Sequence, residues 1–327
     1  MEQGSLGELY LTRSVTKHIR KHNKELQFGG ATLNDCALLS LDETRLVSTE
    51  GWGTNPYLAW VKAMNNLATA GAIPIGVRIL MMFPEGILEE TVKGYMSEFN
   101  KLADEFGIQI MGGHTQISEA YATPTFTVTA LGQCKEYFPE PKKIEAGDKV
   151  IMTKWAGVLG SDIIAKQKAD VLSGRLSRSY IEGGIFGEDK YQVWEEGRLL
   201  SKLSHNVLYM HDVSSGGVYA GLWQLGSRIG KGLKIKHFDI PIKQETIEFC
   251  EVLDINPYML EGTGAMLAVA RDGKEAVNAL QKAGINAAII GEVTQGKERI
   301  VTLSDGGEKR FLAPAKGDEI YKVVSLY

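Results

Sequence analysis

The chain has 327 residues, of which 44% are hydrophobic and 23% are charged, and this length is enough for two ordinary domains with well-buried cores. Its 36 basic and 40 acidic residues leave a formal net charge of -4, so no overall positive excess points to a nucleic acid or to a membrane surface as a partner. No apolar run reaches the roughly 18 residues that cross a bilayer, and the first residues lack the basic start and apolar core of a signal peptide. We therefore expect a cytoplasmic protein.

The first half of the chain carries both helical and strand patterns. Residues 88–106 repeat apolar side chains at spacings of three and four, and Gly107 fits the C-cap of that helix. A second, mostly apolar helix is predicted over 56–70, with Pro56 at its first position. Short apolar or alternating runs predict strands. These strands are 36–41, 45–50, 75–83, 108–112 and 123–132.

A composition break with two prolines and several charges, at 135–148, predicts the domain boundary, with domains over 1–140 and 141–327. The second domain alternates strands with helices, and 173–187 fits neither period, so a long loop is expected there. The predicted strands are 149–153, 207–211, 265–270 and 287–293, and the predicted helices lie near 161–172, 189–204, 216–229, 244–253 and 273–283.

The stretch "MHDVSSGGVYAGLWQL" places small and polar residues between a strand ending near Met210 and a helix. One interpretation is a tight connection capped by Asp212 or Ser214. The other is that the backbone amides of this turn face an anion.

Three further places have residue types suited to a polyphosphate site. Gly157 and Gly160 stand between a strand and a helix, where small residues let backbone amides approach phosphate oxygens. Asp35 and Glu50 lie at strand edges and carry the hard oxygens that Mg²⁺ selects, although a turn aspartate and a surface glutamate are the simpler alternative. His114 follows two glycines at a strand end. Its imidazole is suited to three roles: a ligand, a base or a structural hydrogen-bonding group.

The three cysteines, Cys36, Cys134 and Cys250, lie outside zinc or disulfide spacings and are expected to be small core residues.

The order of these motifs resembles the superfamily of aminoimidazole ribonucleotide (AIR) synthetase, the PurM-like superfamily. Its relatives are selenophosphate synthetase, thiamine-monophosphate kinase and the hydrogenase maturation factor HypE. The motifs are "NDCA", "STE", "NNLATAGAIP", "GGHT", "MHDVSSGGV", "EGTGAMLAV" and "IIGEV", over about residues 30 to 295. The C-terminal half is most similar to the HypE branch.

The resemblance implies a two-domain α/β (α+β) fold, whose N-terminal domain pairs with its twin to form a barrel in a homodimer and whose C-terminal domain closes over ATP. It implies phosphoryl transfer from ATP with Mg²⁺, on a small-molecule or protein-borne substrate. It also implies a metal site at Asp35 and Glu50 and catalytic roles for Asp35 and His114. The implied nucleotide- or phosphate-binding residues are Asn34, Asn66, Gly112, Gly113, Thr115, Gly157, Gly160, Asp212, Ser214, Ser215 and Gly216.

The sequence departs from the family pattern at acidic positions, because Asn34, Asn66 and His114 stand where the family commonly has carboxylates. Fewer carboxylates predict a weakened Mg²⁺ site, since imidazole suits a hard cation poorly. The chain ends in "YKVVSLY" rather than in the cysteine that HypE proteins modify, so dehydration of a terminal thiocarbamate is not expected. Two hypotheses follow: an ATP-dependent enzyme, or a nucleotide- or partner-binding homologue that has lost turnover.

Overall fold

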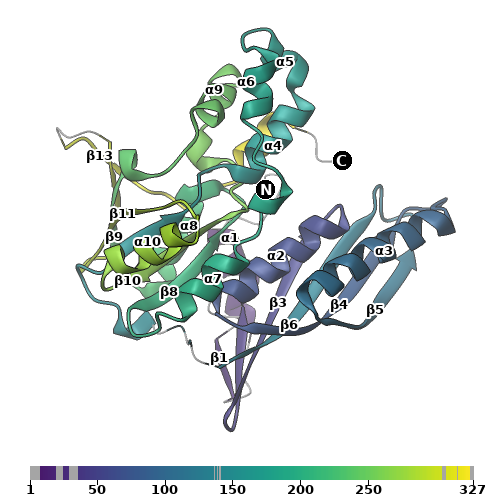
Figure 1. Cartoon of the computed structure of the whole chain (residues 1–327), viewed down its shortest axis with the longest axis horizontal. Coiled ribbons are helices and arrows are strands. Elements are labelled where there is room, and N and C mark those ends of the chain that lie inside the picture. The colour runs from purple at the N-terminus through teal and green to yellow at the C-terminus, as the bar shows by residue number, and fades with distance from the viewer. Residues whose placement is uncertain are drawn as a thin grey trace. The chain divides into compact units, whose positions relative to one another are not determined.

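The computed structural model describes residues 8–19, 25–28, 36–135, 137, 139, 141–303, 307–314 and 316–324. Asn34 and Asp35 lie outside these residues, so their roles stay predictions. The described chain divides into two compact units, an N-terminal unit up to Tyr137 and a C-terminal unit that also includes the segment 8–19 (Figure 1). Over the described ranges, no helix has the length and apolar character needed to cross a membrane.

The N-terminal unit contains a six-stranded sheet in the order β1-β2-β3-β6-β4-β5. All neighbouring strands are antiparallel except β4 and β5, which are parallel. β6 alternates buried and half-buried side chains along its whole length, which confirms the expected antiparallel, half-buried strand. The strands are β1 (Leu26–Phe28), β2 (Ala37–Leu41), β3 (Thr44–Gly53), β4 (Ile73–Phe83), β5 (Gln109–Ile117) and β6 (Thr125–Cys134).

Two helices, α2 (Pro56–Thr69) and α3 (Glu89–Phe106), cover one face of this sheet (Figure 1). The side chain of Asn55 accepts a hydrogen bond from the Leu58 amide at 2.9 Å, and Pro56 opens α2 as predicted. Gly107 ends α3 in the left-handed conformation with φ 63°. α2 approaches β3 so closely that a Cβ on Gly51 would lie 2.2 Å from the Ala59 carbonyl oxygen.

The prediction that a strand ends at Gly112 is wrong, because β5 continues to Ile117. Parallel pairing with β4 continues from Gly76–Gln109 to Phe83–Ile117, so the motif "GGHT" is part of the strand. β5 forms the edge of the sheet, and almost all of its residues are exposed. A Cβ on Gly113 would lie 1.7 Å from the Ile79 carbonyl oxygen, so the strand pairing itself requires glycine there.

The C-terminal unit contains a seven-stranded sheet in the order β13-β12-β9-β11-β7-β10-β8. Only β9 and β12 pair in parallel, so the alternation of strands and helices along this half produces a largely antiparallel sheet. Four of its strands lie where they were predicted, and the short β9, β12 and β13 were not expected. The strands are β7 (Lys149–Thr153), β8 (Val207–Val213), β9 (Gly232–Lys236), β10 (Ala265–Ala270), β11 (Ala287–Thr294), β12 (Arg299–Thr302) and β13 (Lys309–Phe311).

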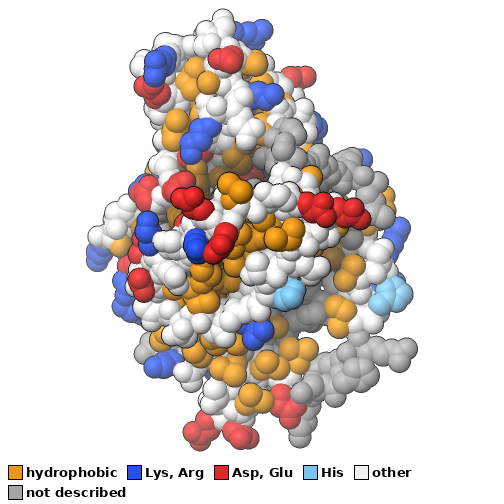
Figure 2. Space-filling model, turned by 90° about the vertical axis from the view of Figure 1, so that its right-hand side faces the viewer, with side chains coloured by type: hydrophobic (Ala, Val, Ile, Leu, Met, Phe, Trp, Pro, Cys, Tyr) orange, Lys and Arg blue, Asp and Glu red, His pale blue; other side chains and the backbone are white. Residues whose placement is uncertain are grey.

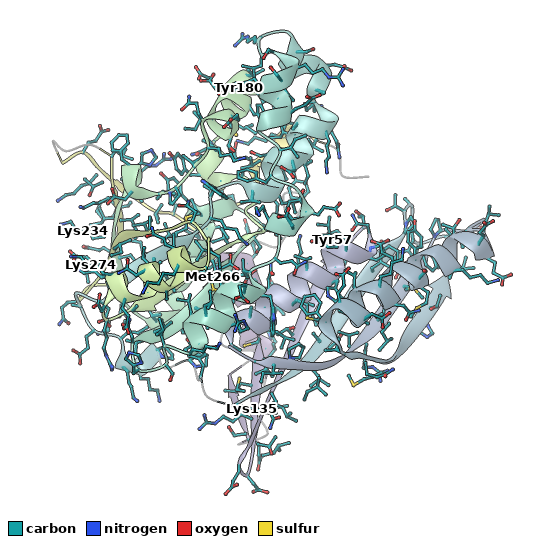
Figure 3. All side chains as sticks on the ribbon, viewed as in Figure 1. Tyr57, Lys135, Tyr180, Lys234, Met266 and Lys274 are labelled. Carbon is teal, nitrogen blue, oxygen red and sulfur yellow. The ribbon has the colours of Figure 1, made fainter. Side chains whose placement is uncertain are left out.

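The core of this unit lies between the sheet and α8 (Gly217–Ile229), whose predicted stripe of Val218, Leu222, Leu225 and Ile229 is buried. Met266 of β10 lies inside, whereas Lys234 and Lys274 point outward (Figure 3). The remaining helices are α1 (Glu8–Ser14), α4 (Val158–Gln167), α5 (Ala169–Ser173), α6 (Arg178–Gly183), α7 (Trp194–Ser201), α9 (Gln244–Val252) and α10 (Gly273–Lys282), with 3-10 turns over 16–18, 141–143, 188–190, 237–239, 257–259 and 319–322.

The prediction of a long loop over 173–187 is wrong, because α6 occupies its middle. Ser177 caps this helix, and Arg178 forms an exposed ion pair with Glu182 one turn later at 2.8 Å. Ile181 is buried, so this short helix attaches to the apolar cluster that contains Phe249.

Two of the three cysteines, Cys134 and Cys250, are buried as expected, while Cys36 is half-buried. Basic and acidic side chains are interspersed among the described residues on the face that Figure 2 shows, so no basic patch covers that face.

Candidate functional site

The turn between β8 and α8 is built by two consecutive glycines. Gly216 and Gly217 adopt φ 83° and 65°, a region that side chains disfavour. A Cβ on Gly217 would also lie 2.6 Å from the Leu260 carbonyl oxygen. Gly216 is the N-cap and no side chain caps the helix, so of the two interpretations the one with a cap from Asp212 or Ser214 is wrong. Asp212 instead belongs to the buried strand β8.

The backbone amide of this turn does face an anion, and the anion is Asp318 of the same unit. The Gly216 amide donates to Oδ2 of Asp318 at 2.6 Å. The other oxygen, Oδ1, accepts from the amides of Glu261 at 3.1 Å and Ile320 at 2.8 Å. Asp318 is 5% exposed, and its burial, together with the nearby charge of Glu261, raises the pKa of Asp318 to about 7.

The "EGTG" loop packs against this turn and against the start of α4. Oε1 of Glu261 accepts from the hydroxyl of Thr263 at 2.7 Å and from its amide at 3.2 Å. The Glu261 carbonyl accepts from the Gly160 amide at 2.9 Å. A Cβ on Gly160 would lie 2.3 Å from Leu260 Cγ, and Gly157 is the left-handed N-cap of α4. Both glycines thus have a packing or backbone reason to be glycine, and their phosphate roles stay predictions.

Glu50 and Asn66 are brought together in the N-terminal unit. Nδ2 of Asn66 donates to the backbone carbonyl of Glu50 at 2.9 Å. The Glu50 carboxylate is exposed on the sheet face opposite the helices, where the hydroxyl of Thr129 donates to it at 3.5 Å. Thr49, the preceding residue, points to the other face and donates to the Ala63 carbonyl of α2 at 2.9 Å. The exposed carboxylate is free to meet a cation from the open face.

His114 shares that open face with Glu50 but lies too far away to bind the same ion. The strand register places Trp52, Thr127, Leu80 and His114 in one row across β3, β6, β4 and β5. Three strand spacings of about 4.8 Å separate the two outer strands by roughly 14 Å. Nε2 of His114 contacts Oε1 of Gln116 at 3.3 Å. Within the described part of the chain, no three His, Cys, Asp or Glu side chains are grouped to hold a metal ion.

Sequence reasoning missed two buried charges that fix the segment 186–196. Asp162 of α4 accepts from the amides of Phe186 at 2.7 Å and Gly187 at 2.9 Å, and from the hydroxyl of Tyr191 at 2.7 Å. Lys154 forms an ion pair with Glu196 at 2.7 Å and donates to the carbonyl of Lys190 at 3.2 Å. Burial lowers the pKa of Lys154.

Asp318 was missed as well, because the Gly-Asp pair at 317–318 indicates only a local turn. Its local role is indeed that of the N-cap of the 3-10 turn at 319–322, where its side chain accepts from the Ile320 amide. The other two amides come from distant parts of the chain, and no sequence spacing indicates that pairing.

Family models and known proteins match this chain over most of its length. The model of the AIR synthase related protein N-terminal domain matches residues 33–134, and that of the C-terminal domain matches residues 145–304. Carbamoyl dehydratase HypE of Rhizobium leguminosarum bv. viciae is 25% identical over 311 residues, which cover 89% of this chain and 85% of that protein.

Solved structures share the fold at low identity. HypE in a HypE-HypF complex superposes with a TM-score of 0.75 and 20% identity, over 90% of this chain and 96% of that one. A HypE solved in complex with ATP superposes with a TM-score of 0.71 and 18% identity, over 97% of each chain. The mixed α/β arrangement with two sheets, expected from the motif order, is thereby confirmed as the PurM-like two-domain fold.

Proposed function

Because the chain belongs to the family of AIR synthase related proteins, we propose that it is an ATP-dependent enzyme that transfers a phosphoryl group. The acceptor is a small molecule or a protein-borne group, and the activity is similar to that of the hydrogenase maturation proteins of the HypE branch. The proposal is supported by the HypE relatives, which match both units in order, and by the HypE that was solved with ATP bound.

The structural observation that carries the proposal is the oxyanion held by the glycine turn. A buried amide at a helix N-terminus attracts negative charge through its unpaired N–H group and the helix dipole. In this chain a carboxylate oxygen takes that position, at 2.6 Å from the Gly216 nitrogen. Ser214 and Ser215 in the same turn are half-buried and offer further donors, so a phosphate group would find suitable partners here.

We propose Glu50, together with Asp35, as the carboxylates that hold Mg²⁺. Glu50 fits because its carboxylate is exposed and accepts a long hydrogen bond, 3.5 Å, from the hydroxyl of Thr129. The ion would offset triphosphate charge during transfer. Asn66 positions Glu50 through the bond to its carbonyl, whereas His114 would have to act on a different group because of its distance.

The open face of the N-terminal sheet supports a homodimer in which two copies pair through it. Trp52 and Ile73 are 45% and 50% exposed, and the strand register places them on the face that α2 and α3 leave uncovered. Exposed apolar groups on one sheet face favour burial against a second surface.

The second candidate, a nucleotide- or partner-binding homologue without turnover, is favoured by the same carboxylate. Asp318 already occupies the Gly216 amide, and the Gly160 amide is taken by the Glu261 carbonyl. Phosphate would therefore have to displace an internal partner before it reached either amide.

Thermal unfolding with ATP or ADP, each with and without Mg²⁺, tests the proposal. Nucleotide at about 100 times its Kd should stabilise the native state by roughly 2.7 kcal/mol. The enzyme requires a shift that depends on Mg²⁺ and is lost in Asp35→Ala and in Glu50→Gln, while Glu43→Gln, an exposed turn glutamate, keeps it. A shift that is independent of metal, without release of phosphate from labelled ATP in the presence of candidate amides, would instead establish the binding homologue.

A further inference from the structure

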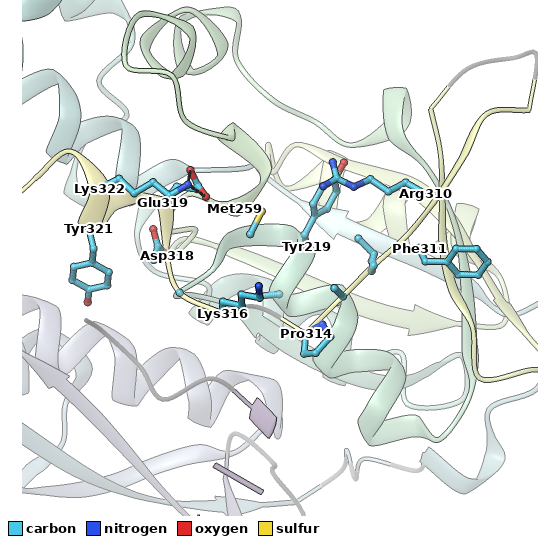
Figure 4. Close-up of a pocket in the computed structure, with 14 residues that line it drawn as sticks. Tyr219, Met259, Arg310, Phe311, Pro314, Lys316, Asp318, Glu319, Tyr321 and Lys322 are labelled. Atoms are coloured by element: carbon cyan, nitrogen blue, oxygen red, sulfur yellow. Dashed lines mark hydrogen bonds and ion pairs between the residues drawn. The ribbon is translucent and has the colours of Figure 1, made fainter. Parts of the chain in front are cut away.

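A cavity of about 540 Å³ lies within the C-terminal unit, between α8 and the segment that follows β12. Tyr219 of α8, Met259 and Pro314 of the C-terminal segment line it (Figure 4). Leu312 also lines it. This volume is typical of a site for a small molecule, and most of the lining is apolar. Asp318, whose carboxylate accepts from the Gly216 amide, is among its lining residues, so the cavity adjoins the proposed phosphate position.

Two cations at this cavity pair with none of the described residues. The side chains of Arg310 and Lys316 line it, and neither forms a hydrogen bond or an ion pair with any residue that the structure describes. The other charges are satisfied: Lys322 pairs with Glu319 at 2.7 Å, and Asp318 is bound by three amides. Counted over the described residues, the cavity therefore carries uncompensated positive charge.

The aromatic wall beside Arg310 is held rigidly. The ring of Tyr219 stacks on that of Tyr258, with 5.4 Å between the ring centroids. The Tyr219 hydroxyl lies 3.0 Å from Nδ1 of His237. Figure 4 shows the Arg310 side chain beside Tyr219. A fixed ring next to an unpaired guanidinium is a suitable surface for a flat group that carries an anion.

We propose that this cavity binds a small organic anion that has a flat apolar body and one acidic group. The body contacts Tyr219, Met259 and Leu312, while Arg310 and Lys316 bind the acidic group. This is a second ligand site beside the proposed phosphate position, with its own binding residues, and it stands whether or not the protein turns over ATP.

The test uses a matched pair of fluorescent probes, 8-anilinonaphthalene-1-sulfonate and N-phenyl-1-naphthylamine, which differ by the sulfonate. We expect the native protein to bind the sulfonate saturably and tighter than the neutral probe by about tenfold or more, because charge-assisted contacts add to apolar burial. The double variant Arg310→Met/Lys316→Met should bind the two probes equally. Lys309→Met, an exposed neighbour outside the lining, should behave as the native protein.

A steric variant locates the site. Ala313 lines the cavity and is exposed, so Ala313→Trp should abolish the saturable binding, whereas Ala146→Trp at an exposed position elsewhere should not. The proposal is overturned if the native protein binds both probes alike, or if Ala313→Trp retains full binding. Displacement of the sulfonate probe by ATP with Mg²⁺ would overturn the claim that this is a second ligand site.

Discussion

The carboxylate of Asp318 receives the backbone amide of Gly216 at 2.6 Å, across 102 residues of sequence. This contact attaches the C-terminal segment to the start of α8, at the turn formed by Gly216 and Gly217. It also fixes one wall of the cavity that Tyr219 and Leu312 line.

Removal of this carboxylate should destabilise the C-terminal unit. Asp318→Ala leaves the buried amides of Gly216, Glu261 and Ile320 without their acceptor, and we expect a loss of about 2 to 3 kcal/mol in the free energy of unfolding. Urea denaturation measures it, with the exposed Asp170→Ala as the control. Equal stability of the two variants would contradict the structural role of the contact.

The raised pKa of Asp318 predicts a pH dependence of stability. Its folded pKa of about 7 exceeds the ordinary 3.8, so the folded state binds the proton more tightly than the unfolded state. This contribution is fully present below the ordinary value and is lost as pH rises through about 7. Relative to Asp318→Asn, the native protein should therefore lose stability as the pH rises from about 4 to about 7, as followed by urea unfolding at each pH. Parallel curves for the two proteins would refute the raised pKa.

Removal of one partner of the buried ion pair between Lys154 and Glu196 should strongly lower the free energy of unfolding. The two side chains are 9% and 2% exposed, so Lys154→Met leaves a buried carboxylate without its cation, and we expect a loss of about 3 to 5 kcal/mol. The double variant Lys154→Met/Glu196→Gln should recover part of that loss in a chemical denaturation cycle. The exposed Lys166→Met serves as the control, and strict additivity in the cycle would show that the pair is not coupled.

Asp162 should hold the segment after α6 in place. Asp162→Ala removes the carboxylate that accepts hydrogen bonds from the amides of Phe186 and Gly187. A hydrogen bond to a charged group contributes about 1.5 to 3 kcal/mol to stability. Hydrogen exchange at these two amides should accelerate by roughly tenfold or more, whereas exchange in β10 should not change. Unaltered protection at Phe186 and Gly187 would show that other contacts fix the segment.

The proposed pairing of N-terminal sheets is tested at Trp52. A lysine there would place a charge within the proposed apolar interface, so Trp52→Lys should convert a dimer into a monomer in size-exclusion chromatography with light scattering. Leu88→Lys changes a residue that is 69% exposed and lies before α3, and it should leave the dimer intact. A native protein that elutes as a monomer, or a dimeric Trp52→Lys, would exclude this interface.

The sequence by itself determined the elements whose signals are local. The helix at 56–69 follows from Pro56 and an apolar run, α3 ends at Gly107 because glycine adopts φ 63° readily, and β6 shows its half-buried alternation directly. The order of the motifs along the chain was enough to indicate the superfamily.

Only the tertiary structure decided where β5 ends and what the glycine turn binds. His114 lies within a strand because pairing with β4 continues past the glycines. β4 is distant in the sequence, so the local pattern around His114 contains no sign of this pairing. That the turn at Gly216 faces an anion was one of two interpretations of the sequence, and the anion is Asp318, which chain folding brings from 102 residues away. Hydrogen bonds between distant segments depend on the packing of the whole unit, so no spacing in the sequence could indicate them.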